Sequence, residues 1–191
     1  MSEALRDFSD KYFKDEKIDG KIYLMAPPRD EHIDVQGNLL NIFNNYFKQN
    51  KKGCRARADS QTYIDNEGNY VKPDVKVLCS NNFDKNVPVI VIEVLSKSTR
   101  ARDLGVKMEK YALLGIKEYW IVTWETLSID LYLLNEDKQY KLYKSYTLLE
   151  EGDDISELSE EEKKEFVKEF CTLTFPELTV KLEDVFDIYT A

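Results

Sequence analysis

The chain has 191 residues, of which 42% are hydrophobic and 12% aromatic. This is enough apolar content for one folded domain, and it excludes a disordered chain. The formal net charge of −9 is an unfavourable overall balance for a protein that binds a polyanion. No apolar run approaches the roughly 20 residues of a transmembrane helix, and residues 1–7 hold no stretch typical of a signal peptide, so we expect no membrane association.

The order of apolar and polar residues predicts a chain of helices and strands. In chain order we expect a helix at 3–16, a strand at 20–25, a helix at 31–49, strands at 56–64, 70–79 and 88–95, a helix at 100–114, strands at 119–124, 128–134 and 139–145, an acidic helix at 159–170, and a final strand or short helix. The β-branched run at 88–95 is typical of the most deeply buried strand. This order favours an α/β (α+β) fold with a mixed central β-sheet flanked by helices.

Charge is distributed unevenly along the chain. Residues 150–169 carry ten acidic and three basic side chains, whereas residues 46–58 carry five basic side chains and no acidic one. Residues 95–117 carry six basic and two acidic side chains. The two basic segments are compatible with a polyanionic partner, and equally with two ordinary solvated faces.

The three cysteines, Cys54, Cys79 and Cys171, are odd in number, widely spaced and without a CxxC pair. This pattern predicts reduced thiols in a cytoplasmic protein. We therefore expect neither a disulfide framework nor a zinc site.

Two carboxylates mark the candidate site. Asp74 follows Pro73 at the start of an apolar strand, and Glu93 stands near the end of the run at 88–95. Asp74 alone is also typical of a turn after proline. A charge in a run like that of Glu93 is costly to bury unless it is paired or metal-bound, and two carboxylates on neighbouring strands are a minimal oxygen set for Mg²⁺. Phosphodiester hydrolysis would also need a nearby cation, usually a lysine two positions after the Glu, where this chain has the apolar Leu95.

Lys107 is the candidate for the missing cation. On the predicted helix at 100–114 it lies roughly 60° from Leu104, at the border of the apolar face, and Asp103 one turn earlier can pair with it. Because the helix packs back on the sheet, the ammonium can reach over the strand ends and offset charge on a phosphoryl group. The alternative is a surface lysine whose stem lies on the apolar face.

Considered together, these residues resemble the Uma-type restriction endonuclease family, whose members have the PD-(D/E)xK nuclease fold. The resemblance spans roughly 20–187 and rests on Pro73-Asp74-Val75, the string from Val91 to Thr99, Asp103, Lys107, Tyr111, the segment Gly115–Trp120, Gly20–Pro28 followed by His32, and Phe175–Leu178. It implies a single domain over 1–191, with a restriction-endonuclease-like core at about 20–145 and a C-terminal extension at about 146–191.

The resemblance also implies a mechanism. In this family the lysine of the motif lies on the following helix, so Asp74, Glu93 and Lys107 take the catalytic roles. Asp74, Glu93 and the backbone carbonyl of Val94 are implied to hold Mg²⁺ or Mn²⁺. The activity implied is that of an endonuclease that hydrolyses phosphodiester bonds of DNA, and cutting both strands of a duplex favours a homodimer.

Four further residues are auxiliary candidates. His32, at the start of a long helix, can act as a proton relay or phosphate contact, or simply as a capping residue. Gln61 can orient a ligand, Asp103 can pair with Lys107, and Tyr111 is expected to pack in the core with its hydroxyl near the site. Two other functions remain open at this point: a non-catalytic binding or interaction module with the nuclease fold, and a nuclease that acts on RNA or structured nucleic acid.

Overall fold

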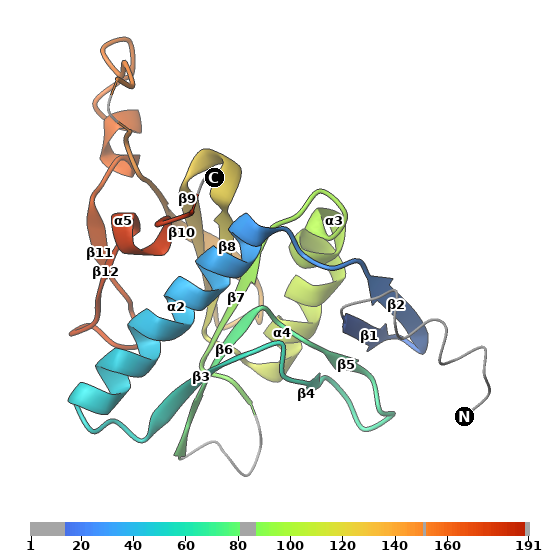
Figure 1. Cartoon of the computed structure of the whole chain (residues 1–191). Coiled ribbons are helices and arrows are strands. Elements are labelled where there is room, and N and C mark those ends of the chain that lie inside the picture. Colours follow the sequence, from blue (N-terminus) through green and yellow to red (C-terminus); the bar gives the residue numbers. More distant parts are fainter. Residues whose placement is uncertain (1–13, 81–86, 151, 190–191) are drawn as a thin grey trace.

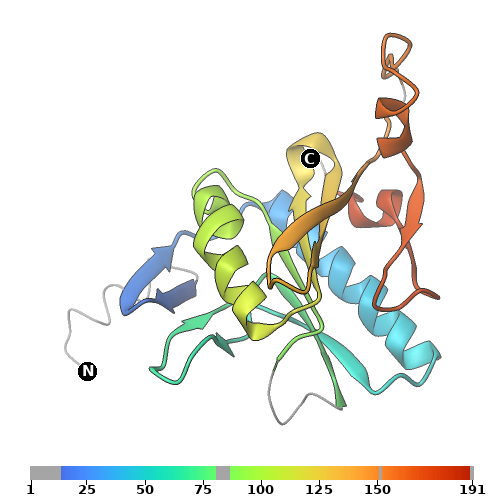
Figure 2. The ribbon, with the colours of Figure 1, turned by 180° about the vertical axis from the view of Figure 1, so that it is seen from behind.

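The computed structural model describes residues 14–80, 87–150 and 152–189. Its central sheet has six strands, in the spatial order β10 (Tyr140–Thr147), β9 (Ser128–Leu134), β8 (Glu118–Thr123), β7 (Ile90–Val94), β6 (Val75–Cys79) and β3 (Cys54–Ala58). Neighbouring strands are antiparallel except β7 and β8, which are parallel. Helices flank this sheet (Figures 1 and 2), which confirms the predicted mixed central sheet between helices.

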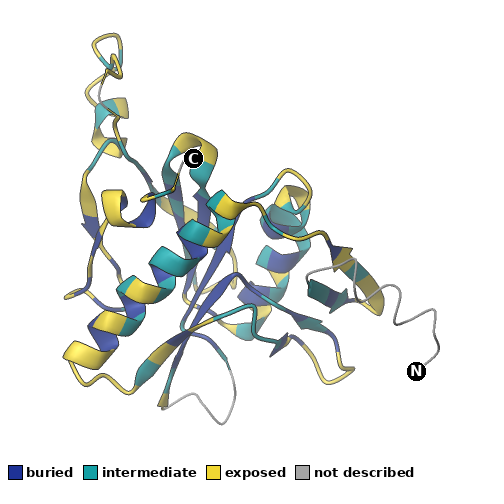
Figure 3. Cartoon of the chain, viewed as in Figure 1, coloured by how far each residue is buried: buried dark blue, intermediate teal, exposed yellow. Residues whose placement is uncertain are grey.

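One face of the sheet is covered by α2 (Asp30–Gln49) and by the C-terminal elements β11 (Glu169–Cys171), β12 (Thr179–Lys181) and α5 (Leu182–Val185). The buried side of α2 repeats at helical spacing and includes Val35, Leu39 and Phe43, the last of which packs on Trp120 of β8 at a ring-centroid distance of 5.6 Å. Figure 3 shows buried and exposed positions alternating along α2. Within the described ranges, no helix is both long and apolar enough to cross a bilayer.

The opposite face carries the connection between the two parallel strands, as parallel pairing requires. This crossover consists of α3 (Arg100–Arg102), a π-helical turn η2 (Asp103–Lys107) and α4 (Met108–Leu114). Beside it lies a smaller sheet with the order β2 (Lys21–Met25), β1 (Lys14–Ile18), β5 (Tyr70–Val71) and β4 (Thr62–Tyr63).

Alternation along β7 divides its side chains between two apolar cores. Ile90, Ile92 and Val94 pack on the α2 side, whereas Val91 and the following Leu95 pack on the α4 side. Glu93 shares the α4 side because strand side chains alternate with a period of two. The apolar Leu95 is therefore a core residue, 3% exposed.

The predicted helix at 3–16 is wrong where the structure describes it, and residues 3–13 lie outside the described ranges. From Lys14 onward the chain forms β1, which pairs with β2 over five residues around the Asp19-Gly20 turn. Both turn residues have positive φ angles, which favours this tight reversal. The side chains of Glu16 and Ile18 point inward at strand spacing, so a period of two prevails over the helical one.

The acidic helix predicted at 159–170 is also wrong. The segment contains only a short 3₁₀ turn, η4 (Glu162–Glu165), before β11 begins. No described residue from 152 to 165 is buried, so a helix here would have no apolar face to pack. The segment instead forms an arm that projects away from the body (Figure 1). The two ends of the arm lie side by side at its base, where the Val167 N–H donates to the Thr147 carbonyl.

The prediction of three reduced cysteines is wrong as well. Cys54 and Cys79 face each other as register partners on the antiparallel strands β3 and β6, and they form a disulfide. The two cysteines are 25 residues apart in the sequence, so their contact could not be predicted without the register of β3 and β6. Cys171 is free and exposed. The expectation of a cytoplasmic protein was based on three reduced thiols, and the disulfide removes that argument.

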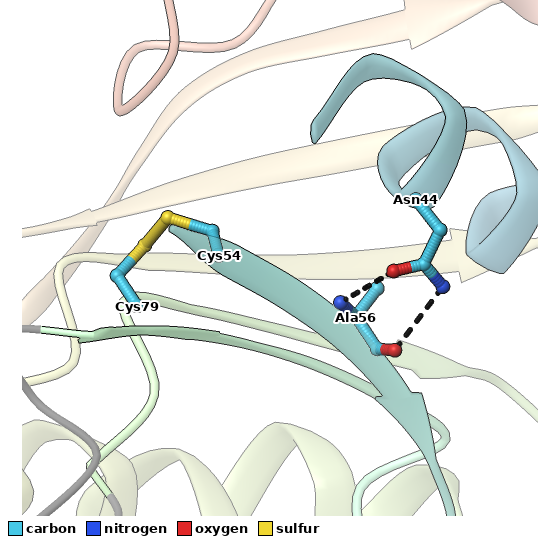
Figure 4. Close-up of a disulfide and its surroundings, with 4 residues drawn as sticks. All are labelled: Asn44, Cys54, Ala56 and Cys79. Carbon is cyan, nitrogen blue, oxygen red and sulfur yellow. Dashed lines mark hydrogen bonds between the residues drawn. A yellow bond between two sulfur atoms is a disulfide. The ribbon is translucent and has the colours of Figure 1, made fainter. Parts of the chain in front are cut away.

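Strand β3 is the edge of the central sheet, and α2 covers part of that edge. The Asn44 amide of α2 both accepts from the Ala56 N–H at 3.0 Å and donates to the Ala56 carbonyl at 3.2 Å, as Figure 4 shows beside the disulfide. Such pairing satisfies backbone groups that would otherwise be free to recruit another strand. The disulfide ties β3 to β6, the strand that follows Asp74, and the Asn44 amide ties β3 to α2.

Candidate active site

The two predicted carboxylates are brought together by the register of β6 and β7. Val75 pairs with Ile92, so the next position places Asp74 opposite Glu93, both on the α4 side of the sheet. The Val94 N–H donates to Asp74 Oδ2 at 2.8 Å, and the Asp74 N–H donates to Glu93 Oε2 at 3.4 Å. Both side chains are buried, at 4% and 1% exposure.

Lys107 completes the predicted set. Its ammonium lies 2.6 Å from Glu93 Oε1 and 3.1 Å from both Asp103 Oδ1 and Glu16 Oε1. The side chain is 2% exposed, so the alternative of a surface lysine is wrong. The helix predicted at 100–114 is interrupted here by η2, in which Gly105 departs from helical geometry. Such π-helical turns are frequent at functional sites, and this one contains Lys107 itself.

Three of the four auxiliary residues lie at the site, and Gln61 lies outside it. The Tyr111 hydroxyl donates to Glu93 Oε1 at 2.6 Å, and His32 Nε2 lies 3.4 Å from Asp74 Oδ1. Asp103 pairs with Lys107, as predicted from their spacing. Gln61 does not line the cavity, and its backbone carbonyl accepts a hydrogen bond from Lys76.

Four residues of the site were missed from the sequence: Lys14, Glu16, Gln36 and Asp59. The Lys14 ammonium lies 2.6 Å from Asp74 Oδ1 and 2.9 Å from Asp59 Oδ1. Gln36 of α2 donates both to Asp59 Oδ2 and to the Asp74 carbonyl, each at 2.9 Å. The alternation of Lys14, Glu16 and Ile18 before the Asp19-Gly20 turn was the one available signal, because it indicates a strand with two charged residues on its inner side.

A cavity of about 350 Å³ opens over these groups. Its walls combine the charged residues above with the loop before α3, the proline segment before α2 and the end of β8; they include Lys14, Pro27, Pro28, Arg29, His32, Asp59, Asp74, Glu93, Ser96, Lys97, Ser98, Thr99, Asp103, Lys107 and Trp124. The basic segment at 95–117 thus contributes Lys97 and Lys107 to the cavity. None of the five basic residues of 46–58 lines it.

The buried charges of the site do not balance. Four buried carboxyl groups, those of Glu16, Asp74, Glu93 and Asp103, meet the ammonium groups of Lys14 and Lys107, which leaves a formal surplus of two negative charges when all four are ionised. Within the described part of the chain, Glu16 Oε2 accepts no hydrogen bond, and Asp103 Oδ1 has only its ion pair with Lys107. Buried, unsatisfied carboxylate oxygens are costly unless a further cation or donor compensates them.

The surplus is reflected in the pKa values of the same groups. Burial raises the pKa of Glu93 to about 8 despite the adjacent Lys107, because Asp103 and Asp74 add to the effect. Burial opposes the charge of Lys107, but Asp103 and Glu93 hold its pKa well above the ordinary value. Burial also acts to raise the pKa of Asp74, yet Lys14 and then His32 keep it well below the usual range. Asp74 is thus the firmly ionised carboxylate of the pair.

Comparison with known proteins first defines the class of fold. A solved structure from Anabaena variabilis ATCC 29413, described as "a putative nuclease belonging to DUF820", superposes with a TM-score of 0.65 and 17% identity, covering 91% of this chain and 89% of that one. At this identity the match shows a shared fold. The chain therefore has the architecture of that nuclease-class structure.

Sequence comparison then gives the family. Residues 5–165 match the model of Uma2, described as "Putative restriction endonuclease". A Synechocystis protein, "Uncharacterized protein slr1290", is 34% identical over 131 residues, which cover 65% of this chain and 68% of that protein. The chain belongs to the Uma2 family, which confirms the resemblance drawn from its motifs.

Proposed function

We propose that this protein is a Mg²⁺- or Mn²⁺-dependent endonuclease that hydrolyses phosphodiester bonds of DNA. The observation that carries the proposal is the excess of four buried carboxyl groups over two ammonium groups beside a cavity into which Asp74, Glu93, Lys14 and Lys107 all reach. A divalent cation would neutralise that surplus. The family membership and the shared fold support a nuclease activity.

The donor set fits such an ion. Among the described residues, no group of three or more His, Cys, Asp or Glu side chains forms a ready metal cage. Mg²⁺ is usually held by only one or two carboxylates, with water and phosphate oxygens completing its shell. Asp74 and Glu93 would provide those carboxylates, and the Val94 carbonyl is proposed as a third oxygen. When bound, the ion would supply Lewis acidity to the scissile phosphate and a water of lowered pKa.

The chain's own residues supply the remaining functions. Lys107 is kept charged by its carboxylate neighbours, so it can orient the attacking water or offset the charge that develops on the phosphoryl oxygens. The Tyr111 hydroxyl and Lys107 both hold Glu93 Oε1, which leaves Glu93 Oε2 as the less occupied oxygen. Lys97, Ser96 and Ser98 at the cavity wall offer contacts to a sugar-phosphate backbone.

The decisive test is cleavage of supercoiled plasmid with Mg²⁺ or Mn²⁺. Wild-type protein should nick the plasmid, and E93Q and K107A should lose about 100-fold or more of the rate. K110A is the matched control, because Lys110 lies on the same helical segment and pairs with Asp19 at the surface instead. Nicking that survives E93Q and K107A would refute the assignment, and cleavage of RNA alone would transfer the activity to that substrate.

A homodimer belongs to the same proposal, because two copies related by a two-fold axis would cut the two strands of a duplex. Light scattering coupled to size-exclusion chromatography measures this directly. A monomer that produces only nicked circles would remove the dimer from the proposal and leave the hydrolytic site in place.

A further inference from the structure

Lys14 occupies a position that resembles a cation site. Its ammonium is surrounded by three oxygens, at 2.6 Å from Asp74 Oδ1, 2.9 Å from Asp59 Oδ1 and 3.0 Å from the Lys72 carbonyl. The side chain lines the cavity and is 12% exposed. Carboxylate and carbonyl oxygens around a positive charge form the kind of environment that hard metal ions take.

This position conflicts with ion binding by Asp74. One carboxylate oxygen, Oδ2, already accepts the Val94 N–H, and the other, Oδ1, holds Lys14. A divalent ion on Asp74 would therefore share a carboxylate with an ammonium group, and the two positive charges would repel each other. The ion and the Lys14 ammonium compete for Asp74.

The backbone around Lys14 is fixed, so the competition involves the side chain alone. β1 is held by five register pairs with β2, and the Lys72 N–H donates to Glu16 Oε1 at 2.9 Å. Asp59 is itself oriented by Gln36, so it remains a partner for Lys14 when Asp74 is taken. A long, flexible ammonium tethered at the cavity wall can then turn to an anion inside the cavity.

Resting on the nuclease function proposed above, we infer that Lys14 is an internal competitor of the divalent ion and couples ion binding to phosphodiester binding. Without substrate, Lys14 neutralises Asp74 and weakens ion binding. A phosphodiester in the cavity attracts the Lys14 ammonium and frees Asp74 for the ion. By linkage the coupling is reciprocal, so the ion strengthens phosphodiester binding by the same factor.

The test measures Mn²⁺ affinity by calorimetry, with and without a short DNA duplex made of phosphorothioate linkages, which resist hydrolysis. For the wild type we expect the duplex to raise Mn²⁺ affinity about tenfold. K14Q keeps a hydrogen-bond donor but removes the charge, so it should bind Mn²⁺ about tenfold more tightly without duplex and gain little from it. K14M serves as a second variant without the donor, and melting curves verify that both are folded.

K17Q is the matched control. Lys17 lies on the same strand and carries the same charge, but it does not line the cavity. It should retain the wild-type affinity and the wild-type gain from duplex. Equal Mn²⁺ affinity in wild type and K14Q, with binding abolished in D74N, would overturn the inference and leave the metal centre intact. Absence of Mn²⁺ binding in every variant, with and without duplex, would overturn both the inference and the proposed function.

Discussion

Lys107 is surrounded by more negative charge than one ion pair requires. Glu93, Asp103 and Glu16 all lie within 3.1 Å of its ammonium. Of these, Glu16 belongs to the N-terminal strand β1 and has one carboxylate oxygen without a hydrogen bond from any described residue. Glu16 therefore adds a negative charge to the site, although one of its two carboxylate oxygens accepts no hydrogen bond from the described residues.

Substitution of Glu16 by glutamine should separate the stability of the site from its affinity for ions. The carbonyl of the new side chain would still accept from the Lys72 N–H, and its amide nitrogen would occupy the position where Glu16 Oε2 has no donor. Because the surplus of negative charge falls by one, we expect E16Q to melt several degrees higher without divalent ions. Its Mn²⁺ affinity should fall about tenfold, as expected for a unit charge acting over roughly 10 Å.

D15N is the control for this change. Asp15 neighbours Glu16 on β1, but its carboxylate pairs with Lys72 and Tyr70, away from the cavity wall. Melting curves and Mn²⁺ titrations of the two variants provide the comparison. A lower melting temperature for E16Q than for the wild type would contradict this prediction. It would mean that the ion pair of Glu16 with Lys107 stabilises the fold more than the extra buried negative charge destabilises it.

The sequence indicated site residues wherever the signal was local. Glu93 stood out because a charge interrupts an apolar strand, and Lys107 because of its spacing from Asp103 on one segment. Lys14 and Glu16 escaped because their partners lie far along the chain: Lys14 contacts Asp74, sixty positions later. Their roles depend on the pairing of β1 with β5, a contact that no nearby residue pattern specifies.

At the level of elements, the strongest periodic patterns were correctly predicted. The helix α2 and the strands β7 and β8 appear within one or two residues of their expected ranges. The crossover helix was predicted as continuous, whereas η2 interrupts it around Gly105. The disulfide was missed because only strand register brings Cys54 to Cys79.

Strand β8 holds a buried acid that links the core to the C-terminal extension. Glu118 is 1% exposed and accepts hydrogen bonds from Trp120 Nε1, at 3.2 Å, and from the Thr174 N–H. Burial raises its pKa above the ordinary value. The folded protein therefore binds more protons at this group than the unfolded chain, and its contribution to stability falls as pH rises from the ordinary pKa through the raised one.

E118Q should reveal this dependence. Gln replaces one of the two oxygens of Glu118 by an NH₂ group that would face a converging donor, whereas a protonated Glu118 keeps an oxygen at both positions, so the variant should lose about 1–2 kcal/mol of stability near pH 5. This loss should shrink toward about pH 7, because only the wild type is weakened as Glu118 ionises. Urea unfolding at both pH values measures the difference, with the exposed Glu109 changed to Gln as control. A loss that is constant or grows with pH would contradict a raised pKa.

For the whole molecule, the acidic arm dominates the charge distribution. Residues 150–165 contain nine acidic and two basic side chains. The described residues of this range project from the body, and none of them is buried (Figures 1 and 3). The strand pairing of Thr147 with Phe166 brings the two ends of the arm together. A short Gly-Ser linker can therefore replace the arm without straining β10.

Replacing residues 150–165 by such a linker should leave the melting temperature unchanged, because none of the described residues in this range is buried. Removal of seven net negative charges should tighten binding to a DNA duplex, most clearly at low salt. Fluorescence anisotropy across a salt series measures the change in binding, and melting curves measure stability. Changing Glu160, Glu161 and Glu162 to Gln in the intact arm should give a smaller gain in the same direction. Weaker DNA binding after the replacement would mean that the arm contacts the nucleic acid itself.

The two site carboxylates also accept backbone hydrogen bonds from the opposite strands, and this affects which residues can change in related proteins. Asp74 accepts a backbone N–H from β7, and Glu93 accepts one from the start of β6, so both acids extend the ladder of these central strands. An apolar replacement would leave a buried N–H unsatisfied, at a cost of about 1–3 kcal/mol. A descendant without activity at this site would therefore keep both acids for folding. Lys107 is under the same constraint, because its loss would leave the buried carboxylates of Glu93, Asp103 and Glu16 without their counter-charge.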